Sequence, residues 1–229
     1  MKRILSIIPA RGGSRGILRK NIATVGNKPL ISWTIEASLG SNYITETIVS
    51  SDDIEILDIA KSCGSKVLKR PLEISGDDAP SSSVIIHIIN ELTEQNIFFD
   101  YIIFLQPTSP LRNAKNIDDA FKEFFNTDSN ALISVSEIDN KFLKTLKLNN
   151  QGYLEGAFNN EYPFYRRQDL PKVYLPNGAI YIIKTSIFLE GNSLLPDKTV
   201  MYEMDSQSSI DIDSYDDIEK VNKIILSGI

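Results

Sequence analysis

The sequence predicts an α/β fold, with a mostly parallel sheet that carries helices on both faces. Three observations support this fold class. Short apolar segments rich in Ile, Val and Leu recur along the chain, helical patterns lie between most of them, and the two kinds of segment alternate. Strands that are apolar throughout are typical of sheets covered on both faces, and alternation with helices implies parallel crossover units.

Each element is predicted from its own pattern. The apolar runs predict strands at Ile4–Ile8, Thr47–Ser50, Tyr101–Leu105, Ala131–Val135, Ala179–Ile183 and Val200–Tyr202. The periodic segments predict helices at Pro29–Leu39, Asp52–Ser62, Ser81–Glu94, Ala114–Phe125 and Tyr215–Leu226. Pro29 suits a first helical turn, and acidic residues open the helix at Asp52. In the third helix apolar residues repeat at helical spacing from Val84 to Leu92.

The length and one irregular stretch predict the domain organisation. A chain of 229 residues that is 42% hydrophobic can form one domain, residues 1–229. Residues 137–176 break the alternation, being polar, Asn-rich and aromatic, and we interpret them as an inserted arm. Exposed aromatic residues there, such as Phe158 and Phe164, favour packing on a second subunit, and hence a homodimer. An arm folded back onto its own domain is the alternative.

Charge and hydropathy exclude several classes of partner. The net charge of −6 and the pI near 4.9 argue against nucleic acid and membrane surfaces, which attract basic proteins. No apolar run reaches the roughly 18 residues that a membrane span needs. Pro9, Arg11 and Arg15 interrupt the N-terminal apolar run too early for a signal peptide, and the lone Cys63 cannot form an internal disulfide. We therefore expect a cytoplasmic protein.

A basic, glycine-rich loop follows the first predicted strand. Residues 11–21 contain three glycines and four cationic side chains. The cations are Arg11, Arg15, Arg19 and Lys20. A loop at the carboxyl end of a parallel strand can bring backbone N–H groups close to phosphate oxygens while cations neutralise their charge. The loop therefore predicts a polyphosphate site, and the alternative is a solvated basic turn.

Three known motifs do not account for this loop. Its spacing matches neither the Walker A loop nor the dinucleotide fingerprint. Residues 12–16 match the nucleophile elbow G-x-S-x-G, but that chemistry needs a histidine base later in the chain. The single histidine, His87, lies between Ile86 and Ile88 in a predicted packed helix. We therefore do not expect Ser14 to be a nucleophile.

Two carboxylates near the C-terminus predict a metal site. Asp211 and Asp213 alternate with Ile210 and Ile212, so on an extended segment both carboxylates point to one face. Oxygen ligands completed by phosphates and water suit Mg²⁺, with Mn²⁺ as a possible substitute. The alternative is that these carboxylates cap the helix that begins near Tyr215.

Several segments together resemble one family. The loop ARGGSRGILRKN resembles the signature loop of the CMP-sialic acid synthetases, also called N-acylneuraminate cytidylyltransferases, of the sugar nucleotidyltransferase superfamily. Further similarity lies in KRP (69–71) followed by Asp77, and in LQPTSPLR (105–112), YRRQDLP (165–171), NGAIY (177–181) and IDID (210–213). The resemblance covers essentially the whole chain and implies a Rossmann-like nucleotidyltransferase fold. The family usually has Lys at the position of Arg15 and Pro at that of Leu18, so we expect a looser empty loop here.

The resemblance also implies a role for each matching residue. The nucleotide would be bound by Arg11, Gly13, Ser14, Arg15, Lys20, Asn21, Arg70, Ser81 and Ser82, where the serines could alternatively cap a helix. The sugar would be bound by Gln106, Arg166, Arg167, Asn177 and Gly178. The metal would be bound by Asp211 and Asp213, and the catalytic residues would be Lys20, Arg15 and Asp211.

The reaction implied is attack by the anomeric hydroxyl of an acidic nine-carbon sugar on the α-phosphorus of CTP, giving CMP-sugar and pyrophosphate. N-acetylneuraminate is the expected acceptor. Legionaminic and pseudaminic acid remain alternatives, and Kdo is disfavoured by the RRQDLP segment. A non-catalytic nucleotide-binding regulator is also conceivable, but it has no need of Asp211 and Asp213.

Overall fold

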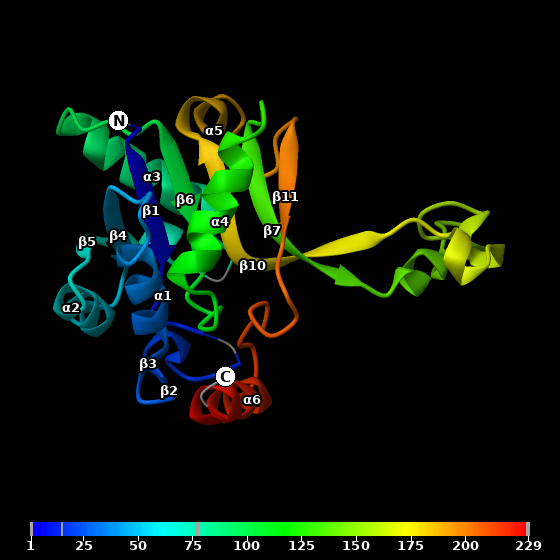
Figure 1. The fold of residues 1–229 in the computed structure, drawn as a ribbon, viewed down its shortest axis with the longest axis horizontal. Helices are drawn as coiled ribbons and strands as arrows, with labels where there is room; N and C mark the ends of the chain where they lie inside the picture. Colours follow the sequence, from blue (N-terminus) through cyan, green and yellow to red (C-terminus); the bar gives the residue numbers. More distant parts are fainter. Residues whose placement is uncertain (1, 15, 77, 228–229) are drawn as a thin grey trace.

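A seven-stranded sheet forms the centre of the molecule in a computed structural model that describes residues 2–14, 16–76 and 78–227 (Figure 1). Its strand order is β11-β7-β10-β6-β1-β4-β5. The strands are β1 (Ile4–Pro9), β4 (Glu46–Ser51), β5 (Lys66–Lys69), β6 (Tyr101–Phe104), β7 (Ala131–Ile138), β10 (Val173–Lys184) and β11 (Thr199–Glu203). Neighbours pair in parallel except β10, which is antiparallel to both β6 and β7. The predicted mostly parallel sheet is confirmed.

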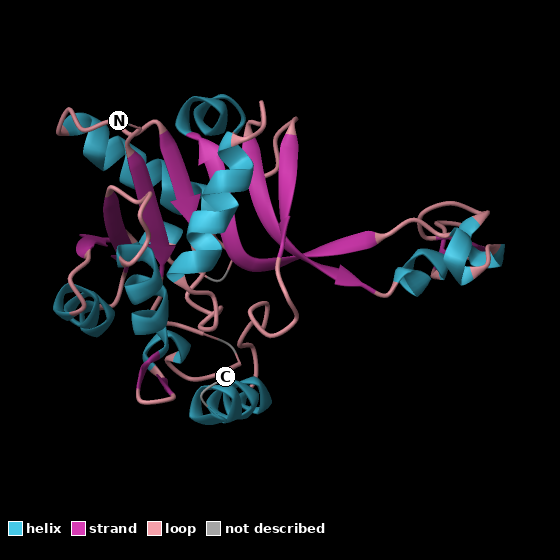
Figure 2. Ribbon diagram, viewed as in Figure 1, coloured by secondary structure: helices cyan, strands magenta, loops and turns pink. Residues whose placement is uncertain are grey.

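Helices cover both faces of this sheet. They are α1 (Leu30–Leu39), α2 (Ile54–Ser62), α3 (Ser81–Glu94), α4 (Ala114–Phe125), α5 (Thr185–Gly191) and α6 (Tyr215–Ser227). Alternate residues of β1 point to opposite faces: Ile4 and Ile8 pack with α1, α2 and α4, whereas Leu5 and Ile7 pack with α3 and α5. The α/β layers predicted from alternation are therefore present (Figure 2).

The sequence patterns missed the short elements. The edge strand β5 carries Lys66 and Lys69 and therefore lacks a continuous apolar run. A two-residue hairpin, β2 (Thr24–Val25) with β3 (Lys28–Pro29), precedes α1 and is too short to produce a period. In α2 the helix begins at Ile54, because Asp53 is its N-cap and accepts hydrogen bonds from the backbone N–H groups of Glu55 and Ile56.

The segment after β7 leaves the sheet and forms an arm. Residues 136–138 of β7 pair with residues 173–175 of β10 beyond the main sheet. Between them lie β8 (Leu146–Leu148), β9 (Leu154–Gly156) and the 3₁₀ turns η3 (Asn140–Lys144), η4 (Tyr162–Phe164) and η5 (Arg167–Asp169). Figure 1 shows this arm projecting away from the domain rather than folded onto it. No helix in the described part of the chain is long and apolar enough to cross a membrane.

Candidate active site

A cavity of about 440 Å³ opens where the loop after β1 meets the residues that follow β6. Ligands of open α/β sheets bind at this position, beyond the carboxyl ends of the strands. The cavity brings together predicted residues from distant parts of the chain, namely Arg11, Gly13, Ser14, Lys20, Asn21, Arg70, Ser81, Gln106, Asp211 and Asp213. Arg15, predicted to bind the nucleotide, and Asp77 lie outside the described residues.

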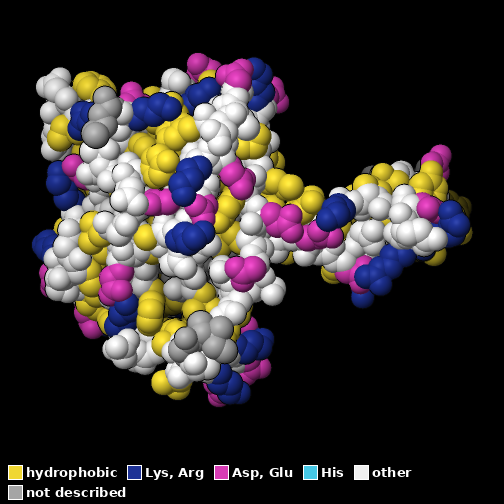
Figure 3. Space-filling model, viewed as in Figure 1, with side chains coloured by type: hydrophobic (Ala, Val, Ile, Leu, Met, Phe, Trp, Pro, Cys, Tyr) yellow, Lys and Arg dark blue, Asp and Glu magenta, His cyan; other side chains and the backbone are white. Residues whose placement is uncertain are grey.

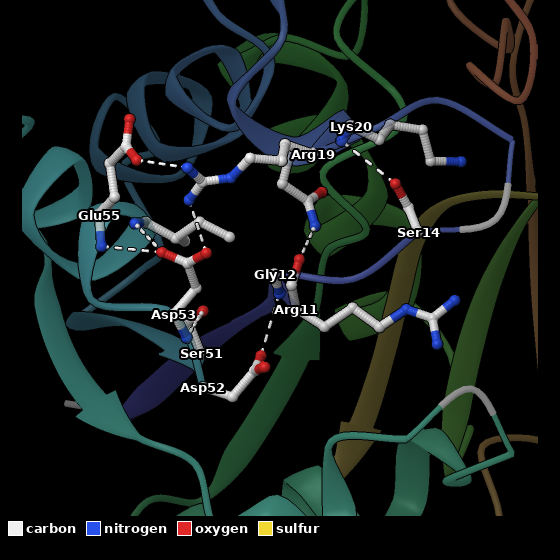
Figure 4. A network of polar contacts seen from close by, with 11 residues as sticks. Arg11, Gly12, Ser14, Arg19, Lys20, Ser51, Asp52, Asp53 and Glu55 are labelled. Atoms are coloured by element: carbon white, nitrogen blue, oxygen red, sulfur yellow. Dashed lines mark hydrogen bonds and ion pairs between the residues drawn. The ribbon is translucent and has the colours of Figure 1, made fainter.

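The loop at residues 11–21 is held in shape by its own hydrogen bonds (Figure 4). The side-chain amide of Asn21 donates to the carbonyl of Arg11 at 2.9 Å, and the backbone N–H of Lys20 donates to Ser14 Oγ at 3.2 Å. The Ser14 hydroxyl donates in turn to the carbonyl of Ile17. Asn21 and Ser14 therefore shape the loop, whereas Arg11 and Lys20 extend long cationic side chains.

Arg70 adds a buried cation to the wall of the cavity. It lies after β5, is 5% exposed, and donates to the carbonyl of Ser50 at 2.6 Å. Burial lowers the pKa of the Arg70 guanidinium to about 10, while Asp52 opposes this change and Arg11 adds to it. Two arginines close enough to repel each other favour an anionic ligand between them.

The serines at the start of α3 do not act as side-chain caps. The N-cap is Pro80, without a side-chain hydrogen bond, and Ser83 Oγ donates to the carbonyl of Pro80 at 2.7 Å. The capping alternative for Ser81 and Ser82 is therefore not observed. Ser81 lines the cavity, whereas Ser82 does not.

The two carboxylates face the cavity as the alternating pattern predicts. Ile212 between them is fully buried against a core that includes Ile17 and Val221, so Asp211 and Asp213 both turn to the cavity side. The start of α6 is capped by other residues, since Ser214 and Asp217 bond to each other reciprocally. The alternative prediction, in which Asp211 and Asp213 cap α6, is therefore wrong.

Asp211 is the more buried of the two carboxylates. Burial raises its pKa, a bond with Thr108 opposes the rise, and the nearby charge of Asp213 adds to it. Asp211 Oδ1 is buried and has no hydrogen-bond partner in the described structure. Lys20 Nζ lies 3.0 Å from Asp213 Oδ1 and donates to the carbonyl of Ile212 at 2.8 Å. A buried carboxylate oxygen without a partner beside a second carboxylate suits a cation.

A second cavity of about 300 Å³ adjoins the first. Gln106 and Asp211 line both cavities, so they stand at the boundary between them. The wall of the second cavity is otherwise made of Ser136, Leu175, Pro176, Asn177, Gly178, Tyr181 and Ser209. It contains no lysine or arginine among the described residues.

The predicted sugar residues of β10 shape this second cavity. Gly178 has φ +76, and a Cβ at this position would collide with Gln106 Oε1. Asn177 is buried, and its amide bonds to Ser134 Oγ at 2.6 Å and Ser209 Oγ at 2.9 Å. Gly178 therefore lets Gln106 lie against β10, and the polar atoms of Asn177 are bonded within the protein.

Arg166 and Arg167 lie in the arm and line neither cavity. Arg166 pairs with Asp169 at 2.6 Å, and Arg167 pairs with Asp139 at 3.4 Å. Within one chain the structure does not bring these arginines together with Gln106. Sequence spacing cannot place them, because the direction of the arm depends on how β7 and β10 leave the sheet.

Tyr181 and Thr108 are site residues that the sequence analysis did not select. Tyr181 lines the second cavity, and burial, with a smaller contribution from Asp211, raises its pKa. Its phenol is the one polar side chain in the apolar strand at residues 179–183, which is a signal that could have identified it. Thr108 lines the first cavity and bonds to Asp211.

A mostly parallel α/β sheet with a basic loop and paired carboxylates at its carboxyl edge is typical of the nucleotidyltransferase class. The chain belongs to the cytidylyltransferase family, whose model matches residues 5–228. This match confirms the predicted family resemblance.

Relatives and solved structures agree with this family. A pseudaminic acid cytidylyltransferase of Campylobacter jejuni is 35% identical over 94% of this chain and 93% of its own length. An N-acylneuraminate cytidylyltransferase of Escherichia coli is 34% identical, and this chain spans 51% of its length. A CMP-N,N'-diacetyllegionaminic acid synthase of Legionella pneumophila is 34% identical over 93% and 91% of the two chains. The structure of a CMP:2-keto-3-deoxy-manno-octonic acid synthetase complexed with CTP covers the whole of both chains, with TM-score 0.74 and 16% identity, and shows the same fold.

Proposed function

We propose that this chain transfers CMP from CTP to the anomeric hydroxyl of a nonulosonic acid and releases pyrophosphate. One observation carries the proposal: two adjoining cavities share Gln106 and Asp211. The first cavity has the cations that a triphosphate needs, and the second has the mixed polar and apolar wall that suits a sugar. The relatives named for pseudaminic, N-acylneuraminic and legionaminic acids support the substrate class.

The reaction joins the anomeric oxygen to the α-phosphorus and breaks the bond between that phosphorus and the oxygen leading to pyrophosphate. The hydroxyl proton passes to solvent water as the new bond forms. Negative charge grows on the α-phosphate and on the leaving pyrophosphate. Lys20 and Arg11, which line the first cavity, would stabilise this charge electrostatically, without a covalent intermediate.

We further propose a magnesium ion, replaceable by Mn²⁺, held by Asp211 and Asp213. The unpartnered Asp211 Oδ1 supports this assignment. The described residues contain no group of three or more His, Cys, Asp or Glu side chains suited to a metal, so phosphate oxygens and water would complete the coordination. When bound, the ion would neutralise phosphate charge and polarise the reacting phosphoryl group.

A homodimer would supply what the second cavity lacks. The acidic sugar carries a carboxylate, and this cavity has no cation of its own among the described residues. The arm carries Arg166 and Arg167 together with exposed apolar side chains, including Phe158 and Phe164. Figure 3 shows basic and hydrophobic side chains together on the surface of the projecting arm. An arm reaching a second copy would bury this apolar surface and could bring an arginine to the sugar carboxylate.

Pyrophosphate release tests the proposed function. The purified chain is incubated with CTP and MgCl₂ and, in separate reactions, N-acetylneuraminate, pseudaminate, legionaminate or Kdo. We expect release with at least one of the three nonulosonic acids. N-acetylneuraminate is the acceptor expected from the sequence, and pseudaminate is the second candidate because of the C. jejuni relative. Asp211→Asn is the control that should be inactive, and no release with any of the three nonulosonic acids would refute the proposal.

A further inference from the structure

One cationic side chain of the loop at residues 11–21 points away from the first cavity. Arg19 and Lys20 are consecutive, but Lys20 lines the cavity and Arg19 does not. The backbone accounts for this divergence, because Arg19 has φ 52 and ψ 40, in the left-handed region that side chains other than glycine seldom adopt. Figure 4 shows the Arg19 guanidinium on the opposite side of the loop from the Lys20 ammonium.

Arg19 instead forms two ion pairs at the start of α2. Its Nη2 lies 2.6 Å from Asp53 Oδ2, and its Nη1 lies 2.6 Å from Glu55 Oε2. Asp53 is itself fixed as the N-cap of α2, since its other oxygen accepts from the backbone N–H of Glu55 at 2.9 Å. The Asp53 carboxylate that pairs with Arg19 is therefore held in place by α2 and does not move freely at the surface.

The beginning of the loop is attached to the same turn. The backbone N–H of Gly12 donates to Asp52 Oδ1 at 3.0 Å. A Cβ at Gly12 would stand 2.8 Å from Asp53 Oδ2, so only glycine allows this close approach. The loop is thus attached to residues 52–55 near both ends, and the residues that face the cavity lie between these attachments or next to them.

We infer that Arg19, Asp53 and Glu55 form an ionic clamp that presets the loop for the triphosphate. Arg19 is then a positioning residue that acts through its neighbour Lys20, whose amine reaches the carboxylate segment at Asp213. Ordering the loop before the nucleotide arrives removes part of the ordering cost from binding. This inference rests on the proposed use of CTP.

A double-mutant cycle separates the clamp from direct contact between Arg19 and phosphate. Arg19→Asn removes the guanidinium but keeps a residue that tolerates the left-handed backbone. Glu55→Gln removes the negative charge of one partner of Arg19, and Glu55 does not line the cavity. Asp58→Asn is the matched control, because it removes one exposed carboxylate from the same helix. The KM for CTP and the KM for the sugar are measured for each variant, with thermal melting to confirm folding.

The clamp and direct contact between Arg19 and phosphate predict different changes in the KM for CTP when Glu55 is replaced by Gln. Since solvent screens exposed ion pairs and each contributes little, we expect the KM for CTP to rise only about fivefold in Arg19→Asn and about twofold in Glu55→Gln. The double variant should match Arg19→Asn alone, because the two residues act as one unit. The KM for the sugar and the Asp58→Asn control should stay near wild type.

Other outcomes would overturn the clamp. If Arg19 bound phosphate directly, Glu55→Gln would lower the KM for CTP or leave it unchanged. A rise in this KM that persisted in the double variant would show that Glu55 acts independently of Arg19. Should Arg19→Asn fail to fold, Glu55→Gln alone still decides by the direction of its effect. A wild-type chain that does not turn over CTP would instead refute the proposed function, so the two failures are distinguishable.

Discussion

Lys20 Nζ lies 3.0 Å from Asp213 Oδ1 and donates to the carbonyl of Ile212 at 2.8 Å. This contact joins the loop after the first strand to a segment about 190 positions later in the chain. It places a cation directly beside the carboxylates proposed to hold the metal. Lys20 is therefore well placed to act on the triphosphate, and its removal provides the first test.

Lys20→Met should lower kcat/KM for CTP by about 10²- to 10³-fold, as loss of one electrostatic donor to a transition state does in other enzymes. Methionine preserves the length of the side chain, so the loop should keep its fold. The measurement is pyrophosphate release under kcat/KM conditions, with circular dichroism as the check on folding. A variant with wild-type turnover would contradict the catalytic role of Lys20.

Gly178→Ala should impair the sugar site and spare the nucleotide site. The new Cβ would collide with Gln106 Oε1, and the positive φ is unfavourable for alanine. We expect the KM for the sugar to rise about tenfold or more, since small misplacements in a site are costly. The KM for CTP should change little. Equal effects on both KM values would instead indicate general destabilisation.

Arg112→Met should leave stability unchanged or raise it. Arg112 is 1% exposed, its Nη2 donates to Thr34 Oγ1 at 2.7 Å, and its Nε and Nη1 have no partner in the described structure. Burial lowers the pKa of this guanidinium, which means that the charged form is poorly solvated. A buried charge without an ion-pair partner is costly to desolvate, so we expect its replacement by an apolar side chain of similar size to be neutral or stabilising. Chemical denaturation measures the free energy of unfolding, and a loss above about 2 kcal/mol would contradict this prediction.

Phe164→Asp should weaken self-association. Phe164 is 87% exposed in the arm, and apolar side chains of this size often dominate the energy of an interface. Sedimentation velocity on wild type should show a dimer, and the variant should dissociate at least about tenfold more readily. Leu189→Asp, at an exposed site on α5, is the control that should leave association unchanged. A monomeric wild type would refute the dimer.

Patterns in the sequence were sufficient for six of the seven strands of the main sheet, for five of the six described α-helices and for the two ends of the site; they missed β5 and α5. Strands at the centre of the sheet are covered on both faces, and they therefore consist mainly of apolar residues. Such runs are visible in the sequence at Ile4–Ile8 and Ala179–Ile183. The loop at residues 11–21 and the pair Asp211 and Asp213 were also recognisable, since each concentrates chemistry in a short stretch. Local patterns of this kind need no knowledge of distant contacts.

Other features were beyond the reach of local patterns. The sequence pattern counted Arg19 only as one of the four cations of the loop, and the structure shows that its left-handed backbone directs it to Asp53 and Glu55. Asn177 lines the second cavity, and the partners of its amide, Ser134 and Ser209, could not be read from the sequence. In both cases the direction of the side chain depends on partners that are distant in the sequence.

The sequence by itself determined the fold class, the family and the chemical character of the two halves of the site, because these depend on residue type and short-range order. Only the tertiary structure decided which residues share a cavity. It placed Gln106 and Asp211 at the boundary between the first and second cavities. It placed Arg166 and Arg167 on the arm, away from both cavities. The physical reason is that strand pairing, above all between β7 and β10, sets distances between residues that no local pattern encodes.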